Sequence, residues 1–401
     1  MTRRTLISHL ALAAVPVWGA RPRDDHHTLI HVFLRGGADT LNLLVPVADD
    51  RYYRLRPSLA IPARQAIRVS EHYALHPAMQ ALEAAFKNGR LGAVQSVGVD
   101  NTTGSHFDCQ DQMEHGDSMQ GAAAGGGWLG RFLRQQPSGS ALAAVAMGKV
   151  MPESLRGAPA VSVMERMEDI TLREAGDVAQ AKKALEKLYG AEVTPLGQGG
   201  RSTLELFQRM ASLQGRGDGP EHGAHYPEDA FGSGLREIAR LIKARLGLRV
   251  ACLDLGGWDT HFFQGEATGL QAERIKLLAE GLAALQLDLH DHHAHYTVMV
   301  TTEFGRRVYE NTSLGTDHGR GFALLALGSH VRGGRVLGSW PLTLQDEVNL
   351  NRPGPGGLTV ETDCRRVFAE VLRGCFPGQV DLAQVFPAAD LTPVGLMSAG
   401  A

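Results

Sequence analysis

The stretch Arg249–Gly319 decides the expected fold, through RVACLDLGGWDTHFFQ at 249–264 and YTVMVTTEFGRRVYENTSLGTDHG at 296–319. The apolar run that opens each segment lacks polar alternation, which is typical of a strand buried on both faces of a parallel sheet. Residues that bind metals or transfer protons follow these runs: Asp259, His261, Glu303, Arg306, Asp317 and His318. Because α/β proteins bind ligands at the carboxyl ends of their strands, this stretch predicts a functional site at one sheet edge.

Two earlier runs extend the same pattern, at Thr28–Leu34 and Leu91–Val97. Residues 77–89 lie between them and have helical apolar spacing, so the order strand, helix, strand indicates a parallel sheet. The first run leads into a Gly-Gly turn and Asp39. We leave open whether Asp39 belongs to the site or caps a turn.

The run at Leu91–Val97 leads into a hydroxyl-rich loop that contains Ser105. A hydroxyl at a strand end, just ahead of a helix, is placed as an activated nucleophile would be. Serine and threonine form helix caps and turns equally readily, so both interpretations of Ser105 stay open.

The remaining segments complete an α/β chain. A mainly helical insertion is expected at about 165–247, a further strand at Phe322–Leu327 and a last helix at 363–376. We therefore predict one α/β domain over residues 28–377, with a mostly parallel central sheet, and a C-terminal tail over 378–401.

The first twenty residues have the features of an export signal. Arg3 and Arg4 precede an apolar run from Leu10 to Trp18 that is too short to span a bilayer. The paired arginines indicate the twin-arginine export machinery as a partner, and a fraying amphipathic terminus is the alternative. The expected location is the periplasm or the exterior, without a stable transmembrane anchor.

Composition excludes other classes of protein. The chain has 40 basic and 43 acidic residues and a net charge of −3, so no nucleic-acid partner is expected. Its four cysteines have no CxxC spacing, which excludes a zinc knuckle. The histidine tract His290–His295 lies at the N-terminal side of a strand, away from the ligand edge, and is interpreted as a solvated loop.

The sequence resembles the exported family called domain of unknown function 1501, over about Leu29 to Phe376. The motifs that carry the resemblance are Arg35-Gly-Gly-Ala-Asp39-x-Leu-Asn42, Leu75-His76-Pro77, Ser105-His106-Phe107, Gly257-Trp-Asp259-Thr-His261, Glu303-Phe-Gly-Arg306 and Gly315-Thr-Asp317-His318-Gly319. That family is similar to the alkaline phosphatase and sulfatase superfamily, which implies a three-layer sandwich and one or two metals beside a nucleophile. The implied metal ligands are Asp39, Asp259, His261, Glu303, Asp317 and His318.

Two departures from the superfamily pattern affect the expected chemistry. Phe304 stands where the superfamily has a histidine, and Glu303 stands in place of an aspartate, so the divalent metal is expected to be Zn, Mg, Mn or Ca. Cys109 lacks the neighbouring Pro and Arg of the sulfatase modification signal, so formylglycine chemistry is not expected.

The expected function is an exported metal-dependent hydrolase of phosphate or sulfate esters, with a small-molecule or glycan ester as substrate. Ser105 is the expected nucleophile, and Arg306 binds the anionic group of the substrate or forms a salt bridge behind Glu303. The alternative is a metal-stabilised binding or scaffold protein of the cell envelope without turnover.

Overall fold

A computed structural model describes residues 27–99, 103–116, 125–136, 142–169, 178–190, 219–339 and 357–398, with a few further residues between 194 and 208. The predicted export signal at 1–20 lies outside these ranges. Within them no helix has both the length and the apolar character that a membrane span requires.

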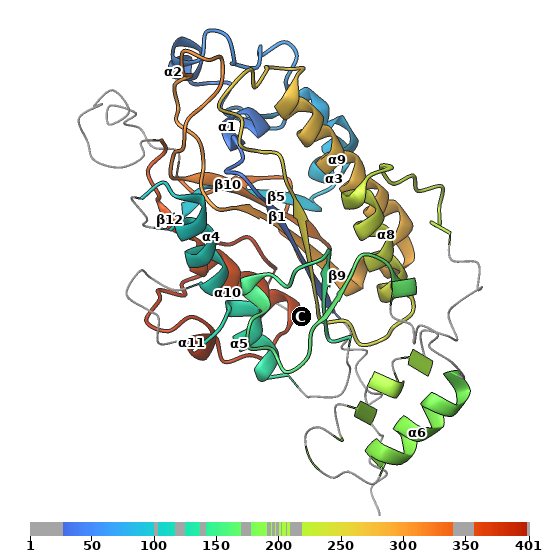
Figure 1. The fold of residues 1–401 in the computed structure, drawn as a ribbon. Helices are drawn as coiled ribbons and strands as arrows, with labels where there is room; N and C mark the ends of the chain where they lie inside the picture. Colours follow the sequence, from blue (N-terminus) through green and yellow to red (C-terminus); the bar gives the residue numbers. More distant parts are fainter. Residues whose placement is uncertain are drawn as a thin grey trace, which may run out of the picture.

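A large sheet forms the centre of the molecule (Figure 1). In the described residues it has nine strands, in the order β11-β5-β10-β9-β1-β8-β6-β7, with β12 also paired to β5. Their bounds are β1 (Thr28–Leu34), β5 (Leu91–Gly98), β6 (Ala144–Met147), β7 (Ser162–Met164), β8 (Val250–Leu255), β9 (Tyr296–Thr302), β10 (Phe322–Gly328), β11 (Val336–Leu337) and β12 (Thr362–Asp363). A separate small sheet joins β2 (Leu44–Val45), β4 (Ala74–Leu75) and β3 (Ile67–Arg68).

Helices cover both faces of the central sheet (Figure 1). On one side lie α3 (Glu83–Lys87), α8 (Ala230–Lys243) and α9 (Leu270–Asp288), and on the other α4 (His106–His115), α5 (Trp128–Arg134), α10 (Cys364–Cys375) and α11 (Leu382–Val385). The short α1 (Thr40–Leu43) and α2 (Asp50–Leu55) follow β1, and α6 (Val178–Gly190) lies apart from the sheet. The predicted class, α/β with a mostly parallel central sheet, is confirmed.

Strand β1 shows why its sequence lacks polar alternation. Ile30, Val32 and Leu34 pack into the core under α8 and α9. Leu29 and Phe33 point to the opposite face and pack into the core under α5 and α10. Because β1 is buried on both faces between parallel neighbours β8 and β9, apolar residues are required at nearly every position.

Strand β10 is the exception to the parallel arrangement. It pairs antiparallel with both β9 and β5. The N-terminal end of β10 therefore lies at the same sheet edge as the C-terminal ends of β5, β9, β1 and β8. This places the loop before β10, which carries Asp317 and His318, beside the loop after β8, which carries Asp259 and His261.

Two regions predicted as appendages contribute to the packed core. Helix α8 lies inside the predicted insertion at 165–247, yet Leu235 and Ile238 are fully buried against the sheet layer. Phe386 and Leu396 lie in the predicted tail and are also buried, against α5 and α10.

Candidate metal centre

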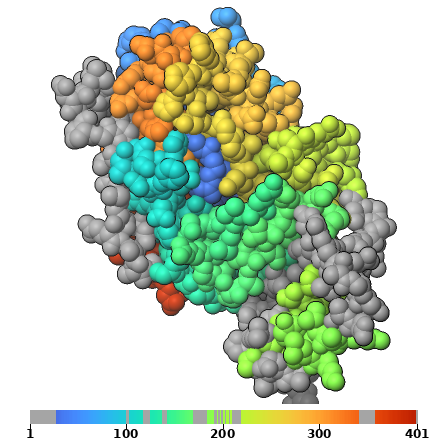
Figure 2. Space-filling model, in the orientation of Figure 1, coloured from blue at the N-terminus to red at the C-terminus, as the bar shows by residue number. Residues whose placement is uncertain are grey.

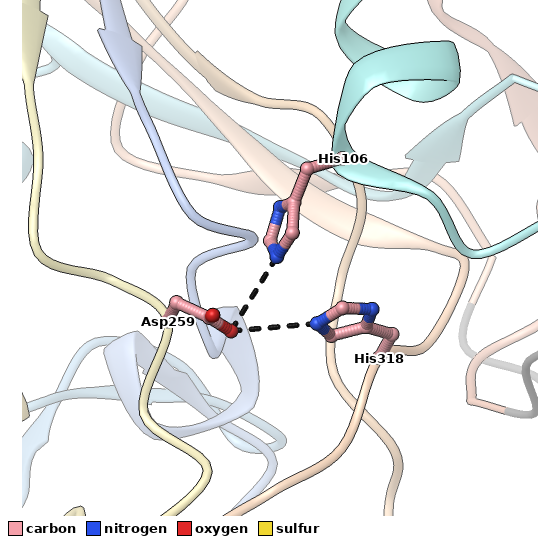
Figure 3. Close-up of side chains that lie close together, drawn as sticks. All are labelled: His106, Asp259 and His318. Carbon is pink, nitrogen blue, oxygen red and sulfur yellow. Dashed lines mark hydrogen bonds and ion pairs between the residues drawn. The ribbon is translucent and has the colours of Figure 1, made fainter.

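Three histidines and an aspartate converge at the sheet edge from three separate segments. Asp259 and His261 follow β8, His318 precedes β10, and His106 is the first residue of α4, after β5. Figure 3 shows His106 and His318 with their rings turned toward the Asp259 carboxylate. In Figure 2 the cyan, yellow and orange surfaces that correspond to these segments meet on the face shown.

The converging atoms are three Nε2 atoms and one carboxylate oxygen. Asp259 Oδ1 lies 3.1 Å from Nε2 of His261, 3.4 Å from Nε2 of His318 and 3.5 Å from Nε2 of His106. The Nε2 atoms of His261 and His318 are 2.9 Å apart. In a tetrahedral zinc site with Zn–N bonds of about 2.0–2.1 Å, neighbouring ligand atoms are about 3.3 Å apart. The separations observed here bracket that value.

The opposite ring nitrogen of each histidine faces an acceptor. Nδ1 of His318 lies 2.7 Å from the Gly104 carbonyl oxygen, which can only accept a hydrogen bond. Nδ1 of His261 lies 2.9 Å from Asp317 Oδ1, and Nδ1 of His106 lies 2.8 Å from Glu303 Oε1. Each Nδ1 therefore carries the proton, and a neutral imidazole then directs its Nε2 lone pair at Asp259.

These lone pairs repel one another unless a cation lies between them. The buried Nε2 of His106 has no hydrogen-bond partner in the part of the chain that the structure describes. His106, Asp259 and His318 each offer a ligand atom, and these atoms lie within 4.8 Å of one another. Histidine ligands held at their other nitrogen by a carboxylate or carbonyl are typical of metal sites, so the residues fit a divalent metal.

The carboxylates around the cluster are held in their charged form. Burial opposes ionisation of Glu303, but hydrogen bonds from His106 and Gln110 outweigh it and lower the pKa of Glu303. Burial also opposes ionisation of Asp259, and the hydrogen bond and charge of Arg306 overcome it, so the pKa of Asp259 is lowered. Ionised carboxylates are the form that binds a metal or orients a histidine.

The two outer histidines titrate in opposite directions. The hydrogen bond to Glu303 raises the pKa of His106 above its usual 6.5, against the effect of burial. Burial lowers the pKa of His318, and the hydrogen bond to Gly104 offsets this only in part. His106 is therefore the ligand at which a proton competes most strongly with a metal.

Glu303 was expected to be a metal ligand, and the structure assigns it another role. It is fully buried, and Oε1 accepts hydrogen bonds from His106, from the Gly36 N–H at 2.9 Å and from Gln110 at 2.9 Å. With its oxygens occupied, Glu303 orients His106. Asp317, also an expected ligand, similarly holds His261 through Oδ1, which Asn311 contacts as well at 3.0 Å.

Asp39 was also expected to be a ligand, and it lies in a separate buried ion pair. Its two oxygens accept hydrogen bonds from Arg56, at 2.6 and 3.0 Å, and Gln264 adds a third at 2.7 Å. Asp39 and Arg56 are 1% and 0% exposed. The cation that Asp39 binds is thus the guanidinium of Arg56.

Arg306 was expected to bind the anionic group of a substrate, and the structure shows it anchoring the loops instead. It is 1% exposed and donates to the carbonyl oxygens of Gly36, Gly37, Trp258 and Thr316. Its Nη2 also donates to Asp259 Oδ1 at 2.6 Å. Arg306 therefore positions Asp259, and its alternative as a salt bridge is correct in kind but involves Asp259 rather than Glu303.

Gly36 and Gly37 let the end of β1 approach these loops. A Cβ atom on Gly36 would lie 2.7 Å from the backbone nitrogen of Asp259. Gly37 has a φ of +61°, and a Cβ there would collide with the ring of Phe304. Side chains at either position would displace the carbonyl groups to which Arg306 donates.

Ser105 is the N-cap of α4, and its Oγ accepts from the Asp108 N–H at 3.4 Å. It stands between Gly104 and His106, both of which contribute to the cluster. The cap interpretation of Ser105 describes its observed hydrogen bond, and its role as a nucleophile stays a prediction.

His106 was part of a recognised motif but was not assigned as a ligand. Its position supplied the signal, because it follows a parallel strand and starts the next helix at the ligand edge. The contact with Glu303, 197 residues away, cannot be inferred from spacing alone. By contrast, none of His290–His295 is buried, and Asp291 forms an exposed pair with His222 at 3.0 Å.

Solved structures with similarity to the chain have low sequence identity. The crystal structure of Ps i-CgsB matches with 9% identity and a TM-score of 0.39, covering 90% of this chain and 74% of that chain. The zinc complex of the C-terminal periplasmic domain of EcEptC from Escherichia coli matches with 10% identity and a TM-score of 0.30, covering 77% and 74%. Alkaline phosphatase from the Antarctic bacterium TAB5 matches with 8% identity and a TM-score of 0.30, covering 77% and 94%.

No curated protein matches the chain in a sequence comparison. The model of the family described as "Protein of unknown function (DUF1501)" matches residues 26–352. This match spans most of the sequence and includes every residue of the cluster, so the chain belongs to the DUF1501 family.

Proposed function

We propose that this protein is an exported metal-dependent hydrolase of phosphate or sulfate esters. The observation that carries the proposal is the convergence of three Nε2 lone pairs and the Asp259 carboxylate, with every Nδ1 facing an acceptor. A set of three imidazoles and one carboxylate favours zinc over magnesium or calcium, which prefer oxygen ligands.

His106, Asp259, His261 and His318 would hold the metal. When bound, a divalent cation acts as a Lewis acid toward an ester oxygen and lowers the pKa of a nearby hydroxyl or water. The protein's own residues keep the ligands in place: Glu303 fixes His106, Asp317 fixes His261, and Arg306 fixes Asp259. No reorientation of these side chains is needed when the metal binds.

Ser105 is the proposed nucleophile because it lies between the residues that contact the cluster. Its hydroxyl is also at the N-terminus of α4, where backbone N–H groups favour negative charge. In a nucleophilic step the Ser105 oxygen would bond to phosphorus or sulfur, the ester oxygen would leave with the alcohol, and water would then release the acid.

The first experiment measures metal content and ester hydrolysis in the same preparations. Purified protein is expected to contain one equivalent of metal, and His106→Ala or Asp259→Ala to lower metal affinity by more than about 100-fold. Lys276→Ala, on an exposed part of α9, is the matched control and retains the metal. A wild-type protein that binds no divalent metal with micromolar affinity would contradict the proposal.

A metal-stabilised binding or scaffold protein of the cell envelope is the second candidate. The capping hydrogen bond of Ser105 favours it, since this hydroxyl contacts no general base among the described residues. Ser105→Ala separates the two candidates. A hydrolase that uses Ser105 loses at least about 100-fold in kcat and retains its metal, whereas a binding protein keeps both its metal and its ligand affinity.

A further inference from the structure

A cavity of about 700 Å³ adjoins the cluster on the side of Asp259. It lies between the loop after β8 and the beginnings of α8 and α9, and its lining includes Asp254, Asp259, Phe262, Leu270, Glu273 and Arg274. Cavities of this volume are typical of sites for small organic ligands. Because Asp259 belongs both to the cavity and to the cluster, a molecule that reacts at the cluster would extend into this space.

Arg274 is the unusual member of the lining. It is only partly exposed, and it has no acidic partner in the part of the chain that the structure describes. Its side chain lies across the backbone of Gly257, where an added Cβ would be 3.3 Å from the Arg274 Cδ. The other charged groups of the chain therefore leave its planar guanidinium available for a carboxylate or sulfate.

The cavity walls also offer apolar surface and hydrogen-bond acceptors. Phe262 is 63% exposed and Leu270 is 53% exposed, although both are large apolar side chains. A Cβ on Gly256 would meet nothing within 4 Å, so the floor beside them is bare backbone. Glu273 and the half-exposed carboxylate of Asp254 supply oxygen acceptors that suit hydroxyl donors.

We propose that this cavity binds the alcohol part of the ester, as a sugar that carries an anionic substituent. The flat face of the sugar ring packs on Phe262 and Leu270, its hydroxyls donate to Glu273 and Asp254, and its carboxylate or sulfate is bound by Arg274. An aromatic acid would fill the apolar wall but leave the two carboxylates without donors. A neutral sugar would leave Arg274 without a partner.

This inference rests on the proposed function for its link to the ester, and its test does not depend on hydrolysis. Full-length exported protein is titrated with three glycosides that contain no cleavable ester at the reacting position: methyl glucuronide, methyl glucoside 6-sulfate and methyl glucoside, in the presence of an excess of the sulfatase and phosphatase inhibitor vanadate where turnover of the sulfate is detected. Wild type is expected to bind at least one anionic glycoside about tenfold more tightly than the neutral one. The preferred anion distinguishes a carboxylate from a sulfate.

Substitution of Arg274 tests where the preference arises. Arg274→Ala is expected to reduce the preference to less than about twofold, and Arg274→Lys to retain part of it, because lysine keeps the charge but not the planar fork. Lys276→Ala removes a cation from the same helix, where it is 63% exposed and pairs with Glu280, and should leave the preference unchanged. Metal content is measured in each variant and is expected to match that of wild type.

Two results would overturn the inference: equal affinity of wild type for all three glycosides, including no binding of any, or a preference that survives in Arg274→Ala. Failure of the proposed function has a different signature. In that case the glycoside preference and its loss in Arg274→Ala persist in a protein that neither contains metal nor cleaves esters.

Discussion

Asp39 and Asp259 follow neighbouring parallel strands, β1 and β8, yet their surroundings are opposite in kind. Asp39 is 1% exposed, and Arg56 and Gln264 occupy both of its oxygens. The Asp259 side chain is 48% exposed, and three imidazole nitrogens face the same oxygen that Arg306 contacts. A carboxylate at a sheet edge is thus structural where the chain supplies its cation, and suited to a ligand where the chain supplies lone pairs.

The buried network around Asp39 also supports the open cluster. Gln264 donates to Asp39 and accepts from the hydroxyls of Thr260, at 2.9 Å, and Thr316, at 2.7 Å. Thr260 lies between Asp259 and His261, and Thr316 directly precedes Asp317. The closed region therefore holds together the two loops that present the open one.

The largest effect is expected from breaking the closed pair. Arg56→Met leaves the Asp39 carboxylate buried without its cation, which should lower the free energy of unfolding by about 3–5 kcal/mol. Denaturant unfolding of the metal-free protein measures this change. The double variant Asp39→Asn with Arg56→Met should recover part of the loss, and a change below about 1 kcal/mol in the single variant would show that the pair is not structural.

A smaller effect is expected from the groups that orient the histidines. Glu303→Gln or Asp317→Asn should weaken metal affinity by about 10–100-fold, because each removes the carboxylate that holds a ligand at its Nδ1. Competition with a chelator of known affinity measures the change. Asp291→Asn, in the exposed pair with His222, is the matched control, and an equal loss there would remove the distinction between orienting and surface carboxylates.

The smallest effect is a shift in the pH dependence of metal binding. Glu303 raises the pKa of His106 above 6.5 in the metal-free protein, and a bound metal displaces that proton. Affinity should therefore fall by about tenfold per pH unit as the pH drops below this raised pKa, and be constant above it. Glu303→Gln should move the bend in a plot of affinity against pH to lower pH. A bend at the same pH in both proteins would exclude His106 as its source.

The sequence predicted the strands and the sheet edge well because both depend on local pattern. Unbroken apolar runs identified β1, β5, β8 and β9, and residues at strand ends identified Asp259, His261 and His318 as neighbours. The predictions that differ from the structure concern partners distant in the chain. Which carboxylate meets which cation depends on loop paths, so the Arg56 partner of Asp39 and the many acceptors of Arg306 left no local signal.

Glu303 and His106 show this limit most clearly. Both residues stood in recognised motifs, and each was considered alone, Glu303 as a ligand and His106 as a companion of Ser105. Their hydrogen bond reverses the assignment, because a glutamate occupied by an imidazole orients a ligand and that imidazole becomes one. A motif identifies residues with chemistry, whereas the pairing between motifs determines what each residue does.

The antiparallel course of β10 also affects when the centre can form during synthesis. The hydrogen bond between His318 and Gly104 spans 214 residues, and the one between His106 and Glu303 spans 197. A nascent chain that has not yet released β10 from the ribosome lacks His318 at the edge, whatever the state of its earlier strands. Capture of a metal by all four ligands would therefore report that the sheet is complete.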